Sequence, residues 1–516
     1  MKRIFLFSSL LGFFIWTLIM PIASAHGLHG GRLDLPVPLW LYLYGAGGVV
    51  VLSFIVAGTF FGKMISFENY PRYNLLGNNF LHSLIKSHLV IRLSRLLGVL
   101  LLFLVVATGL FGTNLTYYNF APVFVWVFWW VGMGFVVALF GNLWALVNPW
   151  SGIFTFIQFL HAKLTGKGRV VPLLTYPDRL GAWPVFLQLC IFVWIELIYP
   201  ESSDPFFIGV MGVFYSVTTL LGMLLFGRHV WLRNGELFSV YFGLLSKLSP
   251  VEFRLSDDTV CLNCSDTKMC IPDGKGCVNC DECASLALGS IELNIRPFAV
   301  GLIKTEELTS GRLAFVLLML SSVTFDGFMA ASQWVKVVLN MKPTLSVLFG
   351  NNYILVVHTF GMAAFFMVFL LFYLLFTYVA FLLSDRDIPY RSATHKFLYS
   401  LLPIALAYNM AHYWTFLATV GQRIFSIASD PFGYGWDLFN TVGFVPKYGF
   451  INASFVWYSQ VTLIVVGHVI AVFISHVIAN QIVRNERRML VSQLPILVLM
   501  VLYTVTSLWV LSQDIV

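Results

Sequence analysis

Charged side chains are scarce in this chain. Asp, Glu, Lys and Arg make up 11% of its 516 residues, whereas hydrophobic residues make up 59%. Soluble domains contain about 25% charged residues, so the composition excludes an ordinary soluble protein. The chain also lacks a basic stripe with interleaved aromatic residues outside its apolar segments, which excludes nucleic acid as a partner. The class that remains is a polytopic protein whose partner is the lipid bilayer.

The first 25 residues predict a signal peptide. Lys2 and Arg3 precede an apolar stretch, and Ala23-Ser24-Ala25 forms a small-residue cleavage site. Cleavage after Ala25 would leave His26 as the mature N-terminus. An uncleaved first span is the alternative interpretation.

Ten apolar segments follow, each long enough to cross about 30 Å of hydrocarbon as a helix. They are 39–62, 96–113, 122–147, 182–200, 205–227, 312–334, 353–383, 397–422, 452–480 and 489–511. We therefore predict an all-α polytopic membrane protein, with about ten transmembrane helices after a signal peptide and a small cysteine-rich loop domain. The predicted division is a signal peptide (1–25), a first five-helix half (26–227), the loop (228–311) and a second five-helix half (312–516).

Lys and Arg are unevenly distributed over the loops. If the mature N-terminus lies outside, the loops predicted to be cytoplasmic carry most of the basic residues, as the positive-inside rule requires. The outer loops carry only Arg32, Lys336, Lys342, Arg423 and Lys447. This asymmetry predicts a protein of the inner (plasma) membrane whose loop 228–311 is cytoplasmic. Segments 151–165 and 236–248 are amphipathic and are predicted to lie along the inner interface.

Cysteine is almost confined to that loop. Cys190 stands alone in a span and is predicted to be a buried apolar residue. The other six cysteines are Cys261, Cys264, Cys270, Cys277, Cys280 and Cys283. Since a cytoplasmic loop lies on the reducing side of the membrane, we interpret these thiols as metal ligands rather than as disulfides.

Two metal centres fit the spacing. Cys261, Cys264, Cys280 and Cys283 have the pattern of paired zinc knuckles. Cys277, Cys280 and Cys283 instead match the C-x2-C-x2-C run of bacterial ferredoxins, although the fourth cysteine and its proline are missing. Zinc and an iron–sulfur cluster therefore both remain as predicted cofactors, and a loop without metal is the third alternative.

Ionisable groups inside the spans are functional candidates, because they are costly in hydrocarbon. They are Glu196, Asp326, His358, His412, His468 and His476. At about 1.5 Å per residue, Asp326, His358 and His412 fall at a similar depth in the outer half of the bilayer, and His468 lies deeper. The first three could converge as catalytic residues on a metal ion or a buried substrate. The alternatives are hydrogen bonds between helices without a ligand, and a haem held by paired histidines, with His468 as a cofactor ligand.

Two further features lie on the outer side. The amine and imidazole of an N-terminal His26 could chelate copper together. The loop after His412 is polar and aromatic, and could fold over the outer mouth as a lid. Within it, Asp430 precedes Pro431, which favours a turn-capping role for the carboxylate.

The chain resembles a bacterial family of integral membrane proteins identified as fenitrothion hydrolase-like. The matching stretches are 25–28 with 34–38, 235–242, 323–328, 411–414 and 429–439, whereas the cysteine loop is a departure from the family. The resemblance implies cleavage of an aryl phosphotriester by water, in an enzyme of the bacterial inner membrane that needs a second membrane subunit. It supplies no catalytic residues to transfer.

Three functions fit these observations. The first is a metal-dependent hydrolase, in which a metal bound by Asp326, His358 and His412 lowers the pKa of its water. The second is a redox or metal-handling membrane protein that uses copper, haem or iron–sulfur. The third is a transporter with a polar site among its helices.

Overall fold

The computed structural model describes residues 38–60, 70–77, 87–166, 170–255, 291–303, 309–447, 449 and 451–513. Within these ranges the chain is mostly helical. Eight helical stretches of the described part are long and apolar enough to cross a membrane. Both results fit the predicted class, an all-α membrane protein.

The first half of the chain supplies helices of very different lengths. They are α2 (Leu39–Phe60), η2 (Leu75–Gly77), α4 (His88–Phe111), η3 (Thr116–Tyr118), α5 (Phe120–Val123), η4 (Phe124–Gly132), α6 (Met133–Phe140), α7 (Leu143–Val147), α8 (Pro149–Thr165), α9 (Trp183–Leu197), α10 (Pro205–Phe226), α11 (Arg228–Asn234) and α12 (Leu237–Ser246). The segment η4 winds as a π-helix and continues α5 into α6 as one apolar rod.

The second half supplies the remaining helices. They are η7 (Val300–Leu302), α14 (Ser310–Met329), α15 (Ser332–Phe349), η8 (Gly350–Asn352), α16 (Tyr353–Leu383), α17 (Tyr390–Leu398), η9 (Tyr399–Leu401), α18 (Leu402–Thr419), η10 (Val420–Arg423), α19 (Ile424–Ser429), α20 (Ala453–Ile482) and α21 (Glu486–Leu511). Each of the ten predicted segments is thus helical. However, α9 has only 15 residues, and α18 is less apolar because it carries Asn409 and His412; neither is among the eight candidate spans.

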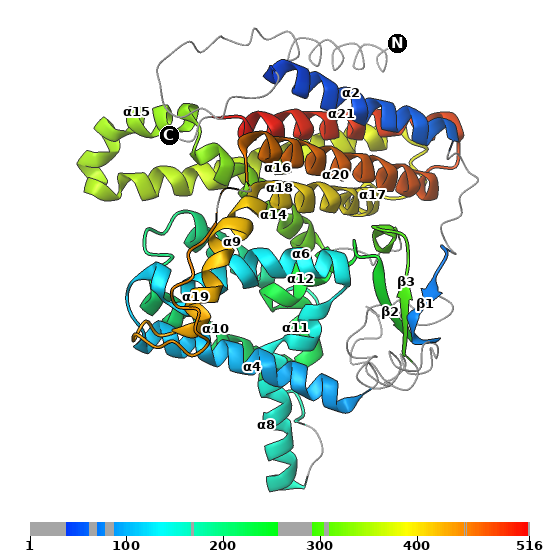
Figure 1. Ribbon diagram of the computed structural model, residues 1–516. Helices are drawn as coiled ribbons and strands as arrows, with labels where there is room; N and C mark the ends of the chain where they lie inside the picture. The colour runs from blue at the N-terminus through cyan, green and yellow to red at the C-terminus, as the bar shows by residue number, and fades with distance from the viewer. Residues whose placement is uncertain are drawn as a thin grey trace.

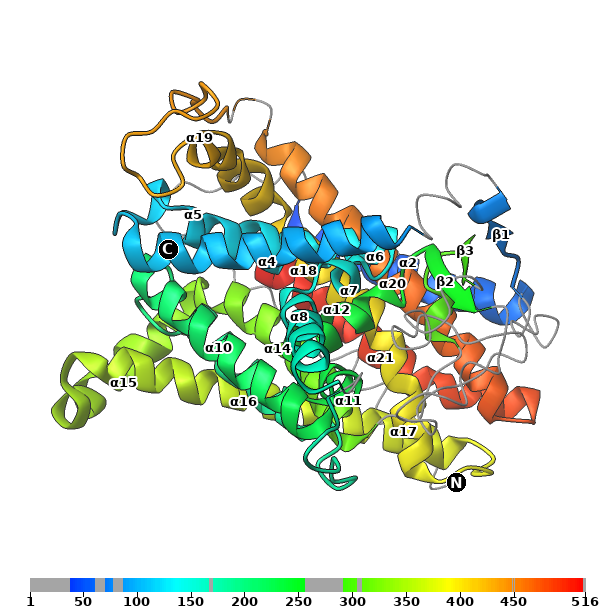
Figure 2. The same ribbon diagram turned by 90° about the horizontal axis from the view of Figure 1, so that it is seen from below.

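The long helices lie in layers that run in a common direction (Figure 1). At one side α2 packs against α20 and α21, although it belongs to the opposite end of the chain. At the other side α4 packs against α10, where Gly109 and Gly209 allow the two backbones to approach closely. Between these layers α14 contacts α9, α16 and α18 and is buried from Gly311 to Phe325. The two halves of the sequence therefore share one core (Figure 2).

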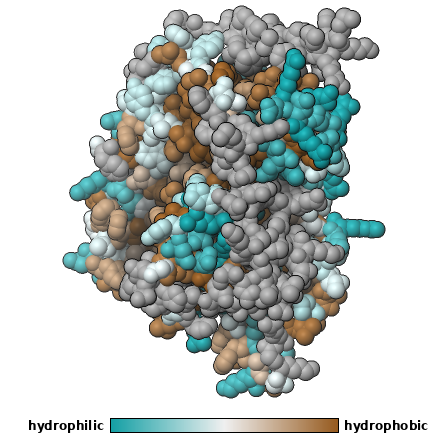
Figure 3. Space-filling view, turned by 90° about the vertical axis from the view of Figure 1, so that its right-hand side faces the viewer, coloured by the Kyte–Doolittle hydropathy of each residue, from teal (hydrophilic) through white to brown (hydrophobic). Residues whose placement is uncertain are grey.

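A small antiparallel sheet closes one end of the helices. Its strands β1 (Tyr73–Asn74), β3 (Ile291–Ile295) and β2 (Val251–Leu255) are arranged in the order β1-β3-β2. The register pairs Leu255 with Ile291, the described residues on either side of 256–290. Hydrophilic patches lie on this end of the molecule (Figure 3). The six clustered cysteines belong to 256–290, outside the described residues, as does His26.

Buried charges hold the sheet together. Glu252 on β2 accepts hydrogen bonds from Arg72 Nε at 2.5 Å, Arg296 Nη1 at 2.6 Å and the Tyr70 hydroxyl at 3.0 Å. The Glu252 side chain is 0% exposed, so these donors satisfy a carboxylate that has no access to water. Residues 70–72 and 296, far apart in sequence, are thereby joined at the same end of the bundle.

The opposite end carries α15 and the loop around α19 (Figure 1). The loop is fastened to the end of α4, since Thr113 N donates to Phe432 O at 2.8 Å and the Tyr434 hydroxyl donates to Phe111 O. Asp430 accepts hydrogen bonds from Tyr434 N at 2.9 Å and Gly435 N at 2.7 Å. The capping role predicted for Asp430 is therefore confirmed.

The two amphipathic segments behave differently. Helix α8 extends away from the body, across the direction of α4 (Figure 1), and its place at the inner interface stays a prediction. The prediction for 236–248 was wrong, because α12 is buried along almost its whole length. Its aromatic side chains pack into the core beside Trp130 and Trp150. The polar residue that made the pattern look amphipathic is the helix cap: Glu236 accepts hydrogen bonds from Phe238 N and Ser239 N.

Candidate functional site

Two helices bring an aspartate and a histidine together among apolar side chains. Asp326 lies near the end of α14, and His412 lies in the second half of α18. His412 Nε2 is 2.8 Å from Asp326 Oδ2, and the Tyr413 hydroxyl donates to the same oxygen at 2.7 Å. The side chains of Asp326 and His412 are 23% and 22% exposed. We call this pair the Asp–His dyad.

Local sequence explains why the helices can approach at this point. Gly327 follows Asp326, and a Cβ atom there would lie 2.7 Å from Val510 Cγ1 and 3.6 Å from His412 Cε1. A larger residue would therefore press α14 away from its neighbours. His412 and Tyr413 are neighbours on α18, so their side chains leave the helix in different directions. Both contact Asp326 Oδ2 because the carboxylate lies between the two side chains. The stretches 323–328 and 411–414 thus form one site.

A second carboxylic acid lies nearby. Glu196, near the end of α9, accepts a hydrogen bond from Trp130 Nε1 at 2.5 Å. Trp130 belongs to the π-helix η4, and π-helical turns often occur at functional sites because they re-aim side chains. The ring of Trp130 also packs 4.7 Å from that of Tyr241 on α12. Elements α9, η4 and α12 therefore meet at this acid.

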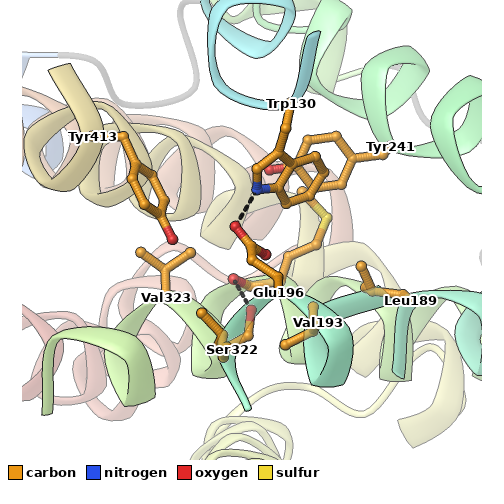
Figure 4. Close-up of a pocket in the computed structure, with 10 residues that line it drawn as sticks. Trp130, Leu189, Val193, Glu196, Tyr241, Ser322, Val323 and Tyr413 are labelled. Atoms are coloured by element: carbon orange, nitrogen blue, oxygen red, sulfur yellow. Dashed lines mark hydrogen bonds between the residues drawn. The ribbon is translucent and has the colours of Figure 1, made fainter. Parts of the chain in front are cut away.

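Glu196 and Tyr413 line the same small cavity. Its other walls include Trp130, Tyr241 and Ser322, and it has room for about one water molecule. Figure 4 shows the Tyr413 hydroxyl and the Glu196 carboxyl on opposite sides, each directed into the space between them. Tyr413 thus touches the dyad with its hydroxyl and faces Glu196 as well.

His358 does not join the dyad. Its ring packs beside Trp334, with centroids 6.0 Å apart, where α15 folds back along α16. Among the described residues, no three His, Cys, Asp or Glu side chains are grouped to hold a metal ion. The expected convergence of His358 with Asp326 and His412 therefore needs correction. Equal depth along a helix does not specify which face a residue occupies, and His358 lies on the face of α16 that contacts Trp334 of α15.

The deeper histidines have separate surroundings. His468 Nδ1 bonds to Ile464 O of its own helix at 2.8 Å, and His476 Nδ1 lies 3.0 Å from Gln493 Oε1. Both are buried, and neither has a described partner at Nε2. His468 is thus placed in the core of the second half rather than at the dyad. Cys190 is a half-buried free thiol on α9 and packs against the main core.

The described residues do not fit a three-ligand metal centre at the dyad. Asp326 Oδ2 and His412 Nε2 bond to each other. The third expected ligand, His358, is in the contact with Trp334 instead. The arrangement is that of an imidazole oriented by a carboxylate, which can accept a proton without a metal.

Several residues of the site were missed from sequence. Glu196 was a candidate, but Tyr413, Trp130 and Tyr241 were not, because buried aromatic residues are so common in membrane helices. Glu236 was also missed; it accepts the Tyr215 hydroxyl at 2.5 Å and caps α12. The short break between α11 and α12, at Gly235 and Glu236, was the signal that could have revealed it.

The fold is that of a helical, polytopic membrane protein, with an Asp–His pair among its helices. Comparison with known proteins finds no family model, no curated protein and no solved structure that matches the chain. The resemblance to the fenitrothion hydrolase-like family therefore still depends on the quoted stretches alone.

Proposed function

We propose that this protein is a membrane enzyme that hydrolyses lipophilic esters, with the Asp–His dyad as its general base. The observation that supports this proposal is the 2.8 Å contact between Asp326 Oδ2 and His412 Nε2. A carboxylate in that position holds the proton on Nε2 and stabilises the imidazolium, which leaves Nδ1 to accept a proton from water. The partly exposed His412 ring is accessible to a substrate.

The surroundings suit an apolar substrate. The dyad lies beside Tyr408 and Tyr413, on helices that also carry many aliphatic side chains. A lipophilic ester, including the aryl phosphotriester that the resemblance implies, could reach such a site from the hydrocarbon. The phosphoryl or acyl group would then meet a water activated by His412. The proposal differs from the metal-dependent mechanism only in the group that activates the water.

We further propose an orientation and a cofactor for the sheet end. Loops rich in Lys and Arg place the sheet on the cytoplasmic side of the inner membrane and the dyad in the outer half. Leu255 and Ile291, which flank 256–290, pair in the sheet; the six cysteines between them would bind zinc or an iron–sulfur cluster. Elemental analysis and an optical spectrum of the purified protein distinguish these two metals. A protein free of zinc and iron would remove the cofactor proposal, and a second membrane subunit would co-purify if the family resemblance extends to assembly.

A direct test uses the full chain in lipid nanodiscs. The substrates are a lipophilic aryl phosphotriester and a p-nitrophenyl carboxylic ester, each of which releases a coloured phenol. His412→Ala and Asp326→Asn should each lower turnover by about 10²–10⁴-fold, the usual contribution of general acid–base catalysis. His161→Ala, on the distant α8, is the matched control and should retain wild-type turnover. Hydrolysis that survives His412→Ala would refute the proposal.

Proton-coupled transport is a second candidate, because one helix is interrupted inside the bundle. After α10 the chain turns back as α11 and reverses again at Glu236, which meets Tyr215 in the middle of α10. Interrupted helices with buried acids commonly form substrate or ion sites in transporters. Uptake of protons by sealed proteoliposomes, with no release of phenol in nanodiscs, would favour this candidate over the hydrolase.

A further inference from the structure

Glu196 has an unusual environment for an acid among membrane helices. Its carboxyl accepts a hydrogen bond from Trp130 Nε1 and otherwise lines the small cavity with Leu189, Val193 and Tyr241. No Lys, Arg or His forms an ion pair with it in the described part of the chain. An unpaired carboxylate is expensive in an apolar site. When it is ionised, such a carboxylate is therefore a strong proton acceptor.

Tyr413 connects this acid to the dyad. Its hydroxyl donates to Asp326 Oδ2 at 2.7 Å, and the same hydroxyl is directed into the cavity that Glu196 lines (Figure 4). A phenol hydroxyl can donate to one group while it accepts from another. The cavity between them also has room for about one water molecule, which could bridge the remaining gap. The order of groups is therefore His412, Asp326, Tyr413 and Glu196.

We infer that Glu196 is a second proton-binding site, coupled through Tyr413 to the Asp–His dyad. This inference depends on proton uptake by the dyad, as proposed above, but not on the reaction that the dyad serves. A proton accepted at His412 Nδ1 forms imidazolium, and the Nε2 proton then passes to Asp326. Asp326 gives a proton to the Tyr413 oxygen as the Tyr413 hydroxyl proton moves to the Glu196 carboxylate. The net result is a neutral His412 that carries its proton on Nδ1, an Asp326 carboxylate and a protonated Glu196. Return of the proton from Glu196 to His412 Nε2 through the same groups, followed by release of the Nδ1 proton to the departing phenolate, restores the Nε2–H imidazole.

This route gives the enzyme a place to store the proton that the attacking water releases. Without it, His412 would remain charged after each attack until the proton escaped through an apolar environment. With it, the positive charge on His412 and the negative charge on Glu196 are removed together. The next turnover starts once Glu196 has returned its proton to His412 Nε2 and the Nδ1 proton has left, because only then is Nδ1 free to accept a proton again.

Infrared spectroscopy tests the inference without any substrate. The full-length protein in nanodiscs is titrated, and the C=O stretch of protonated carboxylic acids is followed. Glu196→Gln should remove one band of a buried acid, whereas Glu201→Gln, at an exposed position beyond the same helix, should leave that band unchanged. Glu196→Asp, which keeps the acid, should retain the band and serves as the check that the site still folds.

Coupling is measured with double variants. His412→Gln should change the titration midpoint of the Glu196 band by about one pH unit when Tyr413 is present, which is the size of interaction that couples two titrations. In protein that also carries Tyr413→Phe, His412→Gln should change the titration midpoint of the Glu196 band by about 0.3 pH unit at most. A buried-acid band that persists in Glu196→Gln overturns the second site, and an undiminished effect in Tyr413→Phe overturns the route. Both readouts remain valid if the protein proves not to hydrolyse esters.

Discussion

The charge cluster of the sheet provides a prediction whose size can be worked out. Glu252 accepts from Arg72, Arg296 and Tyr70, and its side chain and that of Arg296 are 0% and 1% exposed. Glu252→Gln keeps the shape of the side chain but removes the charge, which leaves Arg296 buried without a counter-ion. Removing one partner of a buried ion pair costs about 3–5 kcal/mol. Arg296 also donates to Ser249 O and Lys247 O, so we expect the lower value, about 3 kcal/mol.

The loss should appear locally, where the charges act. Strand β1 is attached to β3 by only two residue pairs, and Arg72 holds the adjacent segment through Glu252. Hydrogen exchange measured by mass spectrometry reports the free energy of such local opening. A loss of about 3 kcal/mol corresponds to roughly 10²-fold faster exchange of the amides in β1 and β3. Exchange in α20 and α21 should not change.

A matched variant shows whether the faster exchange comes from losing the buried charge of Glu252 or from any replacement of Glu by Gln in the sheet. Glu292 lies on β3 and is only partly buried, so Glu292→Gln should accelerate exchange by less than about tenfold, as expected for a weak surface interaction. If Glu252→Gln and Glu292→Gln behaved alike, the buried charges would not be what fastens the sheet to the bundle, and the reasoning would be refuted.

Three further predictions concern the end of the bundle that carries the dyad. His358→Ala should lower turnover by less than tenfold, since its ring packs on Trp334; a loss as large as that of His412→Ala would restore the three-ligand metal site. Asp430→Ala should weaken the loop by about 1–3 kcal/mol, because the amides of Tyr434 and Gly435 lose their acceptor, and proteolysis between 430 and 447 should become faster; unchanged cleavage would contradict this. The hydrogen bond from Ser429 is the main cause that lowers the pKa of Asp437, which lies outside the membrane helices. The ionised Asp437 therefore stabilises the loop above about pH 4, and this stabilisation is lost as the pH falls through the lowered pKa. Trp436 fluorescence should report the loosening of the loop at low pH in the wild-type protein and not in Asp437→Asn.

Much of the fold follows from hydropathy. Ten apolar segments could be located because a span must be long and continuously apolar, and each is helical in the structure. The burial of α12 was not predicted, since its ten residues are too short for a span and the charge of its capping residue Glu236 is typical of an exposed position. The packing of α2 against α20 and α21 has no local signal, because apolar helices are similar in composition whichever neighbour they contact.

The site was partly predictable for a related reason. The cost of burying Asp326 and His412 indicates that each needs a partner, and counting residues along their helices places them at one depth. The rotation of each helix about its axis is not contained in that count, so His358 could not be separated from the pair. Tyr413 and Trp130 could not be identified from the sequence, because the sequence pattern of an aromatic residue that donates a hydrogen bond is the same as that of one that only packs.

The central claim is that Asp326 holds His412 as a proton acceptor. Nitrogen NMR of protein with isotope-labelled histidine, in which His412→Gln assigns the resonance, reports which ring nitrogen carries the proton. We predict that at neutral pH Nε2 of His412 is protonated and Nδ1 is not, and that Asp326→Asn changes this state while the signals of His468 and His476 stay the same. A His412 resonance with the proton on Nδ1, or one that is insensitive to Asp326→Asn, would contradict the account.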